Sequence, residues 1–396
     1  MTVKQRSSRA GRGRTYSLHR MLAKLRTAAR VMLAPSAALL SITALSAAYA
    51  ASAATGPASQ APVLGPASPV VRLAYVTGTA RSPSRVWIAA ASGREAKLLG
   101  PGNQPLLAPN GQSVAASLLG ATANSQKGPA IGIYSAVGAP VANFLDLETA
   151  TATPLAWSPD SRYLAVARQS NEVTNIAAGS GLDVIDTQTG AVVSIAEGQI
   201  YGASFAPDGS DRIVFARSPS LSPSAPSNVY VSGPEGSGLR ALTRDGRSLN
   251  PVWGPRDIAY DRERLRQDDA SVFQIWLISP SGGVERRLTT LRVPSLVSGL
   301  VPLAFSSNGS RLLTQFEGQD TSEAWTVLVP SGRVHRLTVR GQPVMAAGIS
   351  SDGKTVLIDE KSFEEPPSNG RIARIPFAGG RPKVLVAHGS QASWNG

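Results

Sequence analysis

A turn motif recurs along this chain of 396 residues at an almost regular interval. Each copy has an apolar residue, which we call the anchor, followed two positions later by Pro or Ser and then by a polar turn. Successive anchors are 44 to 52 residues apart. The anchors are Leu107, Trp157, Phe205, Trp253, Phe305, Ile349 and, in a shortened last copy, Trp394. A period of this length is typical of an array of small units that each contact their neighbours.

The turns predict the first two strands of each unit. Asn-Gly and Asp-Gly, which follow Leu107 and Phe205, tolerate positive φ and close tight hairpins. Short apolar runs of strand type come after most turns, such as residues 163–167 and 213–216. We call the strand that ends at the anchor strand a and the following run strand b.

A second hairpin follows in every unit and predicts strands c and d. Its two apolar runs enclose a glycine that lies four to six residues before the last apolar pair. These glycines are Gly93, Gly138, Gly190, Gly238, Gly283, Gly332 and Gly380. Seven copies at matched spacing indicate units of four strands.

The two ends of the repeat region complement each other. Residues 72–100 supply strands b, c and d without a strand a, and Gln391 to Trp394 supply a strand a with nothing after it. Pairing these segments closes a ring and leaves no sheet edge there. The sequence therefore predicts an all-β fold, a β-propeller of about seven four-stranded blades over residues 72–396, with six blades as the alternative.

The first 50 residues have the order of a secretory leader. Nine of the 39 basic residues precede residue 31, no acid occurs before residue 51, and residues 31–50 are uncharged. We predict that residues 1–50 are a cleaved signal or, alternatively, a membrane anchor helix, and that the Pro/Ala/Ser-rich residues 51–71 are a linker. Both alternatives place the propeller outside the cytoplasm of a bacterium, either secreted, periplasmic or anchored to the membrane.

Composition limits the partners. The formal charge of +13 falls to about +4 without the leader, so nucleic acid is not expected as a partner. The chain has no cysteine, which excludes disulfides, thiolate metal sites and a lipid-modified cysteine. We expect a monomer that contacts the membrane only through its N-terminal segment.

The turns, the residue before them and the Gly-Gly…Arg-Leu-Thr ending of residues 282–289 resemble the repeats of TolB-like and WD-like propellers. The resemblance covers residues 72–396. It implies a fold and no particular activity, because such propellers include binding proteins, lyases and accessory domains of peptidases. TolB itself has an α/β domain before its propeller, whereas a linker is predicted here, so a Tol-system role is not carried over.

Loop lengths indicate where binding takes place. The a–b and c–d turns are short, while the b–c connections at residues 168–181, 217–228, 261–272 and 360–370 are long and polar. The d–a connections lie at the same end of a propeller. They are predicted to present a ring of amide and phenol groups at the channel mouth, formed by Gln104, Tyr201, Asn250, Gln342 and Gln391. Such a ring suits a peptide terminus or a glycan; the alternative is ordinary solvated polar residues at strand starts.

The sequence gives less support to metal binding and to catalysis. Asp261, Glu263, Asp268 and Asp269 have the oxygen ligands that Ca²⁺ prefers, but the interleaved Arg262, Arg264 and Arg266 favour a solvated charged loop. The region after the leader has two histidines, His335 and His388, and no G-x-S-x-G, H-E-x-x-H or Gly-rich phosphate motif. We therefore expect no catalytic residue, no metal and no cofactor. The aromatic anchors are interpreted as packing between blades.

The sequence leads to one main hypothesis. It is an extracytoplasmic, non-catalytic propeller scaffold that binds a protein or peptide through its long-loop face. The alternative is a glycan-binding protein of the cell envelope or a lyase-like propeller.

Overall fold

The computed structural model describes residues 70–79, 82–118, 128–138, 140–147, 150–170, 179–220, 225–265, 271–292, 298–318, 321–360 and 370–396. Every regular element in these residues is a β-strand, as the sequence predicts. No helix in this part of the chain is long and apolar enough to cross a membrane. The predicted leader, residues 1–50, and all but the end of the linker lie outside the described residues.

The strands form units of four, and we number the units along the chain. In each unit strands a to d pair in order and antiparallel. The strands of units 1 to 4 are β30 (Ser390–Trp394), β1 (Arg72–Thr79), β2 (Ser82–Ala90) and β3 (Lys97–Pro101); β4 (Asn103–Leu107), β5 (Ser113–Ser117), β6 (Gly128–Ser135) and β7 (Pro140–Leu147); β8 (Ala150–Trp157), β9 (Tyr163–Ser170), β10 (Gly181–Asp186) and β11 (Val192–Glu197); and β12 (Gln199–Phe205), β13 (Ile213–Ser218), β14 (Asn228–Ser232) and β15 (Arg240–Ala241).

Units 5 to 7 follow the same order. Their strands are β16 (Ser248–Trp253), β17 (Ile258–Leu265), β18 (Ser271–Ile278) and β19 (Arg286–Arg287); β20 (Ser298–Phe305), β21 (Arg311–Glu317), β22 (Ser322–Leu328) and β23 (Arg333–Arg336); and β26 (Met345–Ile349), β27 (Thr355–Asp359), β28 (Ile372–Pro376) and β29 (Lys383–Val386). A hairpin of β24 (Thr338–Val339) and β25 (Gln342–Pro343) joins units 6 and 7. Units 5 and 6 share one eight-stranded sheet, because β18 also pairs in parallel with the start of β20.

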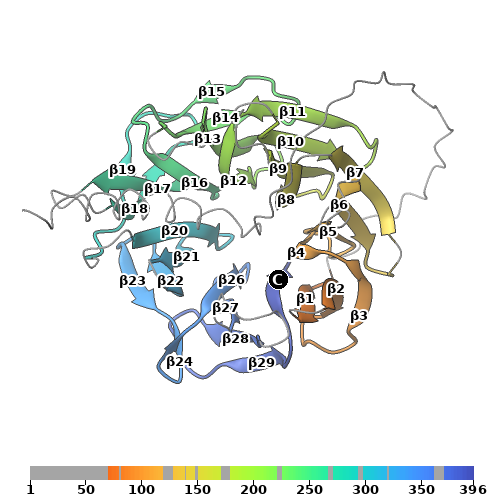
Figure 1. Ribbon diagram of the computed structural model, residues 1–396. Helices are drawn as coiled ribbons and strands as arrows, with labels where there is room; N and C mark the ends of the chain where they lie inside the picture. Colours follow the sequence, from red (N-terminus) through yellow and green to blue (C-terminus); the bar gives the residue numbers. More distant parts are fainter. Residues whose placement is uncertain are drawn as a thin grey trace, which may run out of the picture.

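The units are arranged in a ring, with the a strands toward the centre and the d strands at the edge (Figure 1). Each a strand contacts the a strand of the next unit, and β26 contacts β30. The described residues contain seven hydrophobic clusters, and each draws its side chains from two neighbouring units, including units 7 and 1. The core therefore lies between the units and runs around the whole ring.

The ends close the ring as the sequence predicts. The first strand, β1, pairs antiparallel with the last, β30, with Leu73 opposite Trp394. Asn395 reinforces this closure, because its Oδ1 accepts the Arg72 N–H at 2.8 Å and its Nδ2 donates to the Pro109 carbonyl at 3.0 Å. The final residues thus contact both unit 1 and unit 2.

The turn glycines and the anchors have the predicted roles. All seven glycines of the c–d turns have positive φ, from 64° at Gly238 to 131° at Gly380. Trp157, Phe205 and Trp253 are buried. Trp157 Nε1 donates to the carbonyl of Leu106 in the preceding unit at 3.0 Å. The aromatic anchors are confirmed as contacts between units.

Three of the predicted b–c connections are too long. β17 continues to Leu265 and β18 begins at Ser271, so most of residues 261–272 are strand. Likewise, β13 includes residues 217 and 218, and β9 includes residues 168 to 170. The run of polar residues in these segments suggested loops, but antiparallel pairing extends the strands, and alternate residues such as Asp261 and Glu263 are buried.

Candidate functional site

The a strands carry an irregularity at the same position in each unit. The register between strands a and b shifts close to the residue three positions before the anchor. A β-bulge of this kind re-aims a side chain and often lies beside a functional site. We call these equivalent residues the central ring: Gln104, Pro154, Gly202, Asn250, Pro302, Ala346 and Gln391.

Three of the predicted channel-mouth residues belong to the central ring. Gln104, Asn250 and Gln391 have φ of 51°, 44° and 53°, a left-handed conformation that is uncommon for residues other than glycine. Their counterpart in unit 4 is Gly202, which adopts the same conformation without a side-chain penalty. Strained positions that are held by the surrounding structure cluster at binding sites.

Hydrogen bonds connect two of these amides directly. The Gln104 N–H donates to Gln391 Oε1 at 2.7 Å, and Gln104 Oε1 accepts the hydroxyls of Ser117 at 3.1 Å and Thr153 at 3.2 Å. All of these bonds use the carbonyl oxygen of the side-chain amide. Within the described residues the NH₂ groups of Gln104 and Gln391 are left to donate to another molecule.

The other two predicted residues lie elsewhere. Tyr201 precedes Gly202 and is buried in the cluster between units 4 and 5. Gln342 is exposed in the β24–β25 hairpin, where it pairs with Val339. The central-ring residue of unit 7 is Ala346, which spacing alone did not reveal because the extra hairpin lengthens that d–a connection.

A side chain in strand b of one unit accepts the backbone N–H of the central-ring residue of the next unit in two cases. Gln315 Oε1 accepts the Ala346 N–H at 2.8 Å, and Asp359 Oδ2 accepts the Gln391 N–H at 2.6 Å. Both acceptors lie three residues beyond the strand b residue that pairs with the anchor. A buried acceptor in strand b thus satisfies a backbone donor that the bulge frees.

Asp261 occupies this acceptor position in unit 5, but its donor is missing. The ring residue of unit 6 is Pro302, which has no N–H. Asp261 is fully buried, and within the described residues neither of its carboxylate oxygens has a hydrogen-bond partner. Burial raises the pKa of this carboxyl to about 7, and the nearby Asn250 amide lowers it by less.

The prediction of a solvated charged loop at this segment is wrong. Asp261 and Glu263 are both buried in β17, because alternate residues of the strand face the neighbouring unit. Asp268 and Asp269, the other residues of the alternative Ca²⁺ site, lie outside the described residues. The part of the chain that the structure describes holds no group of three or more His, Asp or Glu residues placed to bind a metal ion.

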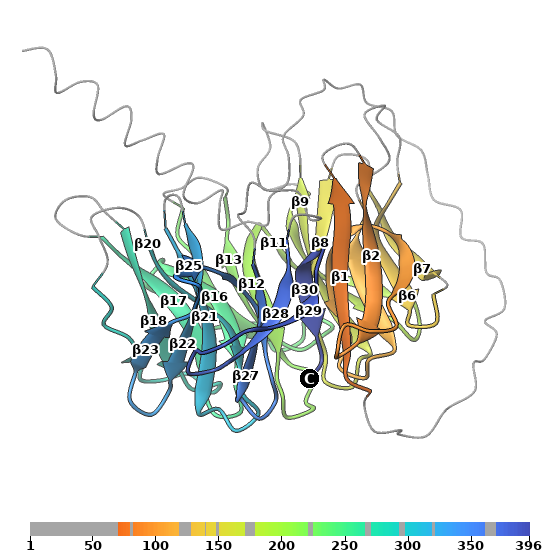
Figure 2. The same ribbon diagram turned by 90° about the horizontal axis from the view of Figure 1, so that it is seen from below.

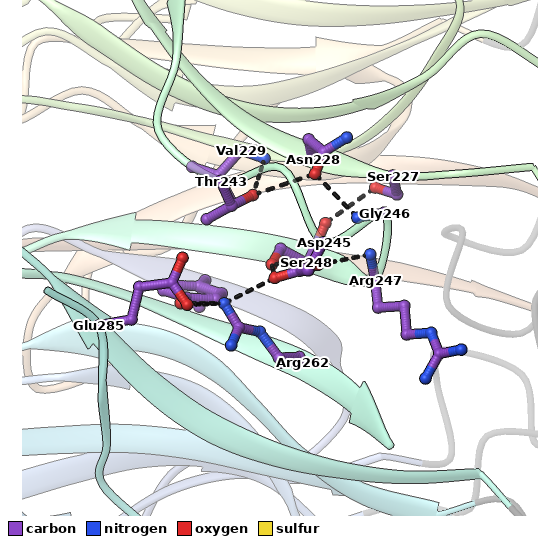
Figure 3. Close-up of polar contacts among 11 residues, drawn as sticks. Ser227, Asn228, Val229, Thr243, Asp245, Gly246, Arg247, Ser248, Arg262 and Glu285 are labelled. Atoms are coloured by element: carbon purple, nitrogen blue, oxygen red, sulfur yellow. Dashed lines mark hydrogen bonds and ion pairs between the residues drawn. The ribbon is translucent and has the colours of Figure 1, made fainter. Parts of the chain in front are cut away.

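Arg262, the residue after Asp261 in β17, belongs to a cluster of polar contacts with Asp245 and Glu285 (Figure 3). Its guanidinium pairs with Asp245 at 2.6 Å and with Glu285, and it stacks on the Trp276 ring at 4.4 Å from the centroid. Asp245 also accepts the Ser248 hydroxyl at 2.9 Å. The arginine is therefore neutralised and holds the d–a connection of residues 242–247 against strand b.

Asn228 holds the other side of the same connection. Its Oδ1 accepts the Gly246 N–H at 3.0 Å, and the Ser227 hydroxyl donates to the Ser248 carbonyl at 2.8 Å (Figure 3). Sequence reasoning missed this cluster because its members come from four segments of two units. Its contacts to Asp245, Gly246 and Ser248 hold the connection that leads into Asn250.

Comparison with known proteins supports the fold. No protein-family model and no curated protein sequence matches the chain. Among solved structures, the β-propeller domain of the Trilobed protease from Pyrococcus furiosus has 12% identity and a TM-score of 0.57, over 80% of this chain and 92% of that one. An oligogalacturonate lyase in complex with manganese has 14% identity and a TM-score of 0.53, over 74% of this chain and 84% of that one.

TolB from Acinetobacter baumannii is also similar, with 15% identity, a TM-score of 0.48, and coverage of 83% of this chain and 68% of TolB. The first two likenesses show that the chain folds as a β-propeller, and they confirm the predicted resemblance to TolB-like propellers for the fold. The Pyrococcus propeller has an open velcro topology, whereas β1 and β30 pair in this chain.

Proposed function

We propose that this β-propeller, with its seven units as blades, is a non-catalytic scaffold that binds a segment of a partner protein at the central ring. The observation that carries the proposal is the set of three left-handed amide residues at equivalent positions, two of which have NH₂ groups left to donate. The carbonyls of an extended peptide are the natural acceptors for such donors.

The surrounding structure supports a preformed site. The Gln104 carbonyl is fixed by Ser117 and Thr153, and the Gln391 backbone is fixed by Asp359. A binding group that is already held in place loses little entropy on binding. The b strands end and the c strands begin at the same end of the ring as the d–a connections, and connections on a rigid scaffold commonly bind partners.

The basic segment and the uncharged stretch of residues 31–50 support export. We therefore propose an extracytoplasmic location, with the propeller either released or held at the membrane by the N-terminal segment. A glycan-binding or lyase-like role is the second candidate, because a similar propeller is an oligogalacturonate lyase.

The experiment removes the amide donors and keeps the acceptors. Gln104→Glu and Gln391→Glu retain an oxygen for the internal hydrogen bonds but lose the NH₂ group. Gln112→Glu is the matched control, since Gln112 is an exposed amide in the a–b turn at the other end of unit 2. Melting curves check that all three variants keep the fold.

Partner binding is read by a photo-crosslinking residue at exposed Gln342, introduced into the full chain in the cells that produce it. We expect one discrete crosslinked protein with the parent chain and with Gln112→Glu, and its loss with the two ring variants. Equal crosslinking in all variants contradicts the ring as the site. Binding of fluorescent oligosaccharides that the ring variants abolish, without a crosslinked protein, favours the glycan alternative.

A further inference from the structure

The c–d turns of units 4 to 7 and the first residues of the d strands carry many basic side chains, and we call this surface the outer tips. In the side view the strands of the propeller stand next to one another, so turns of one kind gather at one end (Figure 2). All the basic side chains of the outer tips are exposed: Arg240, Arg286, Arg287, Arg333, Arg381 and Lys383.

Few acids oppose these charges. Glu285 pairs with Arg262, a partner that it shares with Asp245. Glu235 is the other acid of these four turns. The equivalent turns of units 2 and 3, residues 136–139 and 187–191, contain no charged residue. In unit 1 the same positions hold Arg94, Glu95 and Lys97, and the Lys97 ammonium donates to the Val137 carbonyl. The turns of units 4 to 7 are thus the more basic part of the rim, which is distinct from the central ring.

Aliphatic side chains lie among the arginines. Leu239, Val284, Leu328 and Val384 are exposed, and Val284 is 92% exposed in the turn that precedes Arg286. Exposing such a residue on a turn gives no benefit in water. An apolar side chain flanked by basic residues is the arrangement that inserts below the headgroups of an anionic membrane.

Neighbouring tips are also tied together. The Arg240 guanidinium of unit 4 donates to the carbonyl of Ser281 in the turn of unit 5 at 3.3 Å, and to that of Pro280. This contact holds Leu239 and Val284 in adjacent, fixed turns. A surface that is already ordered binds a planar partner with a small entropic cost.

We propose that the outer tips of units 4 to 7 dock on an anionic lipid surface, with the arginines at the headgroup phosphates and the aliphatic side chains in the interface. A membrane fits better than a nucleic acid. Single-stranded nucleic acid is bound by stacking on exposed aromatic rings, and none of the exposed large hydrophobic side chains in the described residues is aromatic. This contact is additional to the predicted one through the N-terminal segment.

The absence of cysteine from the sequence allows a local test in the full chain. Val284→Cys is labelled with an environment-sensitive fluorophore, and Val137→Cys, 71% exposed in the uncharged turn of unit 2, is the matched control. A label reports only its own surroundings, so membrane binding by the N-terminal segment does not imitate insertion of the turn.

With vesicles of phosphatidylcholine and phosphatidylglycerol we expect a blue shift at position 284, reversed by salt, and no shift at 137. Vesicles of phosphatidylcholine alone, glycerol phosphate, polygalacturonate and single-stranded DNA should give none. Equal shifts at both positions overturn the proposal. So does a shift at 284 with neutral vesicles or with any of the soluble polyanions.

The arginines are tested in the Val284→Cys background. Arg286→Gln/Arg287→Gln should weaken vesicle binding about tenfold. Arg244→Gln/Arg247→Gln, two exposed basic residues of the d–a connection at the other end of the propeller, should change it less than about twofold. Arg333→Gln/Lys383→Gln is the second test pair should the first melt early. Equal weakening by the Arg244/Arg247 pair and the tip pairs means that total charge is responsible, and it refutes the docking surface.

Discussion

The Gln104 N–H donates a hydrogen bond of 2.7 Å to Gln391 Oε1, across 287 residues of sequence. The contact joins strand a of unit 2 to the last strand of the chain. A second bond, from the Leu107 N–H to Ser393 Oγ at 3.0 Å, runs parallel to it. Since β30 also pairs with β1, the C-terminal strand connects unit 1 to unit 2 at the inner edge of the propeller.

Removal of residues 388–396 should therefore destabilise the whole propeller. The deletion leaves β1 with an open edge and takes Ala392 and Trp394 out of the cluster between units 7 and 1. We expect a loss of at least about 3 kcal/mol, the cost of removing one large buried side chain. Near-UV and far-UV circular dichroism should show one coincident transition at lower temperature. A truncated chain that melts like the full one disproves closure by β30.

Trp253→Ala tests packing between units 4 and 5. Trp253 is buried with Val214 and Tyr260 in one cluster. Its truncation should cost about 3 to 5 kcal/mol, measured by urea unfolding. Leu239→Ala is the control, because Leu239 is exposed and its loss should change the unfolding free energy by less than about 0.5 kcal/mol. Similar values for the two variants refute the role of the anchor.

Asp261 should make stability depend on pH. Its pKa is about 7 in the folded chain and 3.8 ordinarily, so the folded state holds the proton that the unfolded state releases. The free energy of unfolding therefore falls as pH rises from about 4 to about 7, and the effect is complete above that. Asp261→Asn removes this contribution.

The variant and the parent chain should differ little at pH 4. At pH 8 the variant should be more stable by up to about 4 kcal/mol. Comparing the two chains cancels other titrations, including that of Glu317, whose pKa burial also raises to about 7. A constant difference across this range means that Asp261 is charged and satisfied in the folded protein.

Pro302→Ala supplies the missing donor. At pH 8 the new N–H should bond the ionised Asp261, as the Gln391 N–H bonds Asp359. A hydrogen bond to a charged group contributes about 1.5 to 3 kcal/mol, and loss of the proline offsets about 0.4 to 1 kcal/mol. The variant should thus be more stable than the parent at pH 8 but not at pH 4.

Pro154→Ala is the matched control for this substitution. Pro154 is also a central-ring proline, but strand b of the preceding unit presents Ser117, whose hydroxyl donates to the Ala152 carbonyl at 2.7 Å. A pH-dependent gain is therefore expected for Pro302→Ala alone. Should Pro154→Ala show the same gain, the explanation through Asp261 fails.

The sequence by itself determined the units, their turns and the closure. Anchors such as Trp157 and turn glycines such as Gly283 act within a few residues, because a tight turn needs positive φ and an apolar residue beside it needs burial. The terminal strands were also visible, since residues 72–100 lack a strand a that Trp394 supplies. The amides Gln104, Asn250 and Gln391 were also predicted, because each lies in a d–a connection shortly before an anchor.

Only the tertiary structure decided what these residues do. The sequence predicts Asp261 as part of a charged loop. In the structure β17 places it against unit 6, whose central-ring residue is Pro302, and its carboxylate has no partner in the described residues. The sequence likewise predicts Arg262 as a solvated charge, whereas in the structure it forms ion pairs with Asp245 and Glu285. Burial and hydrogen bonding between units depend on which residues of the next repeat lie opposite, and that pairing is set by packing around the ring.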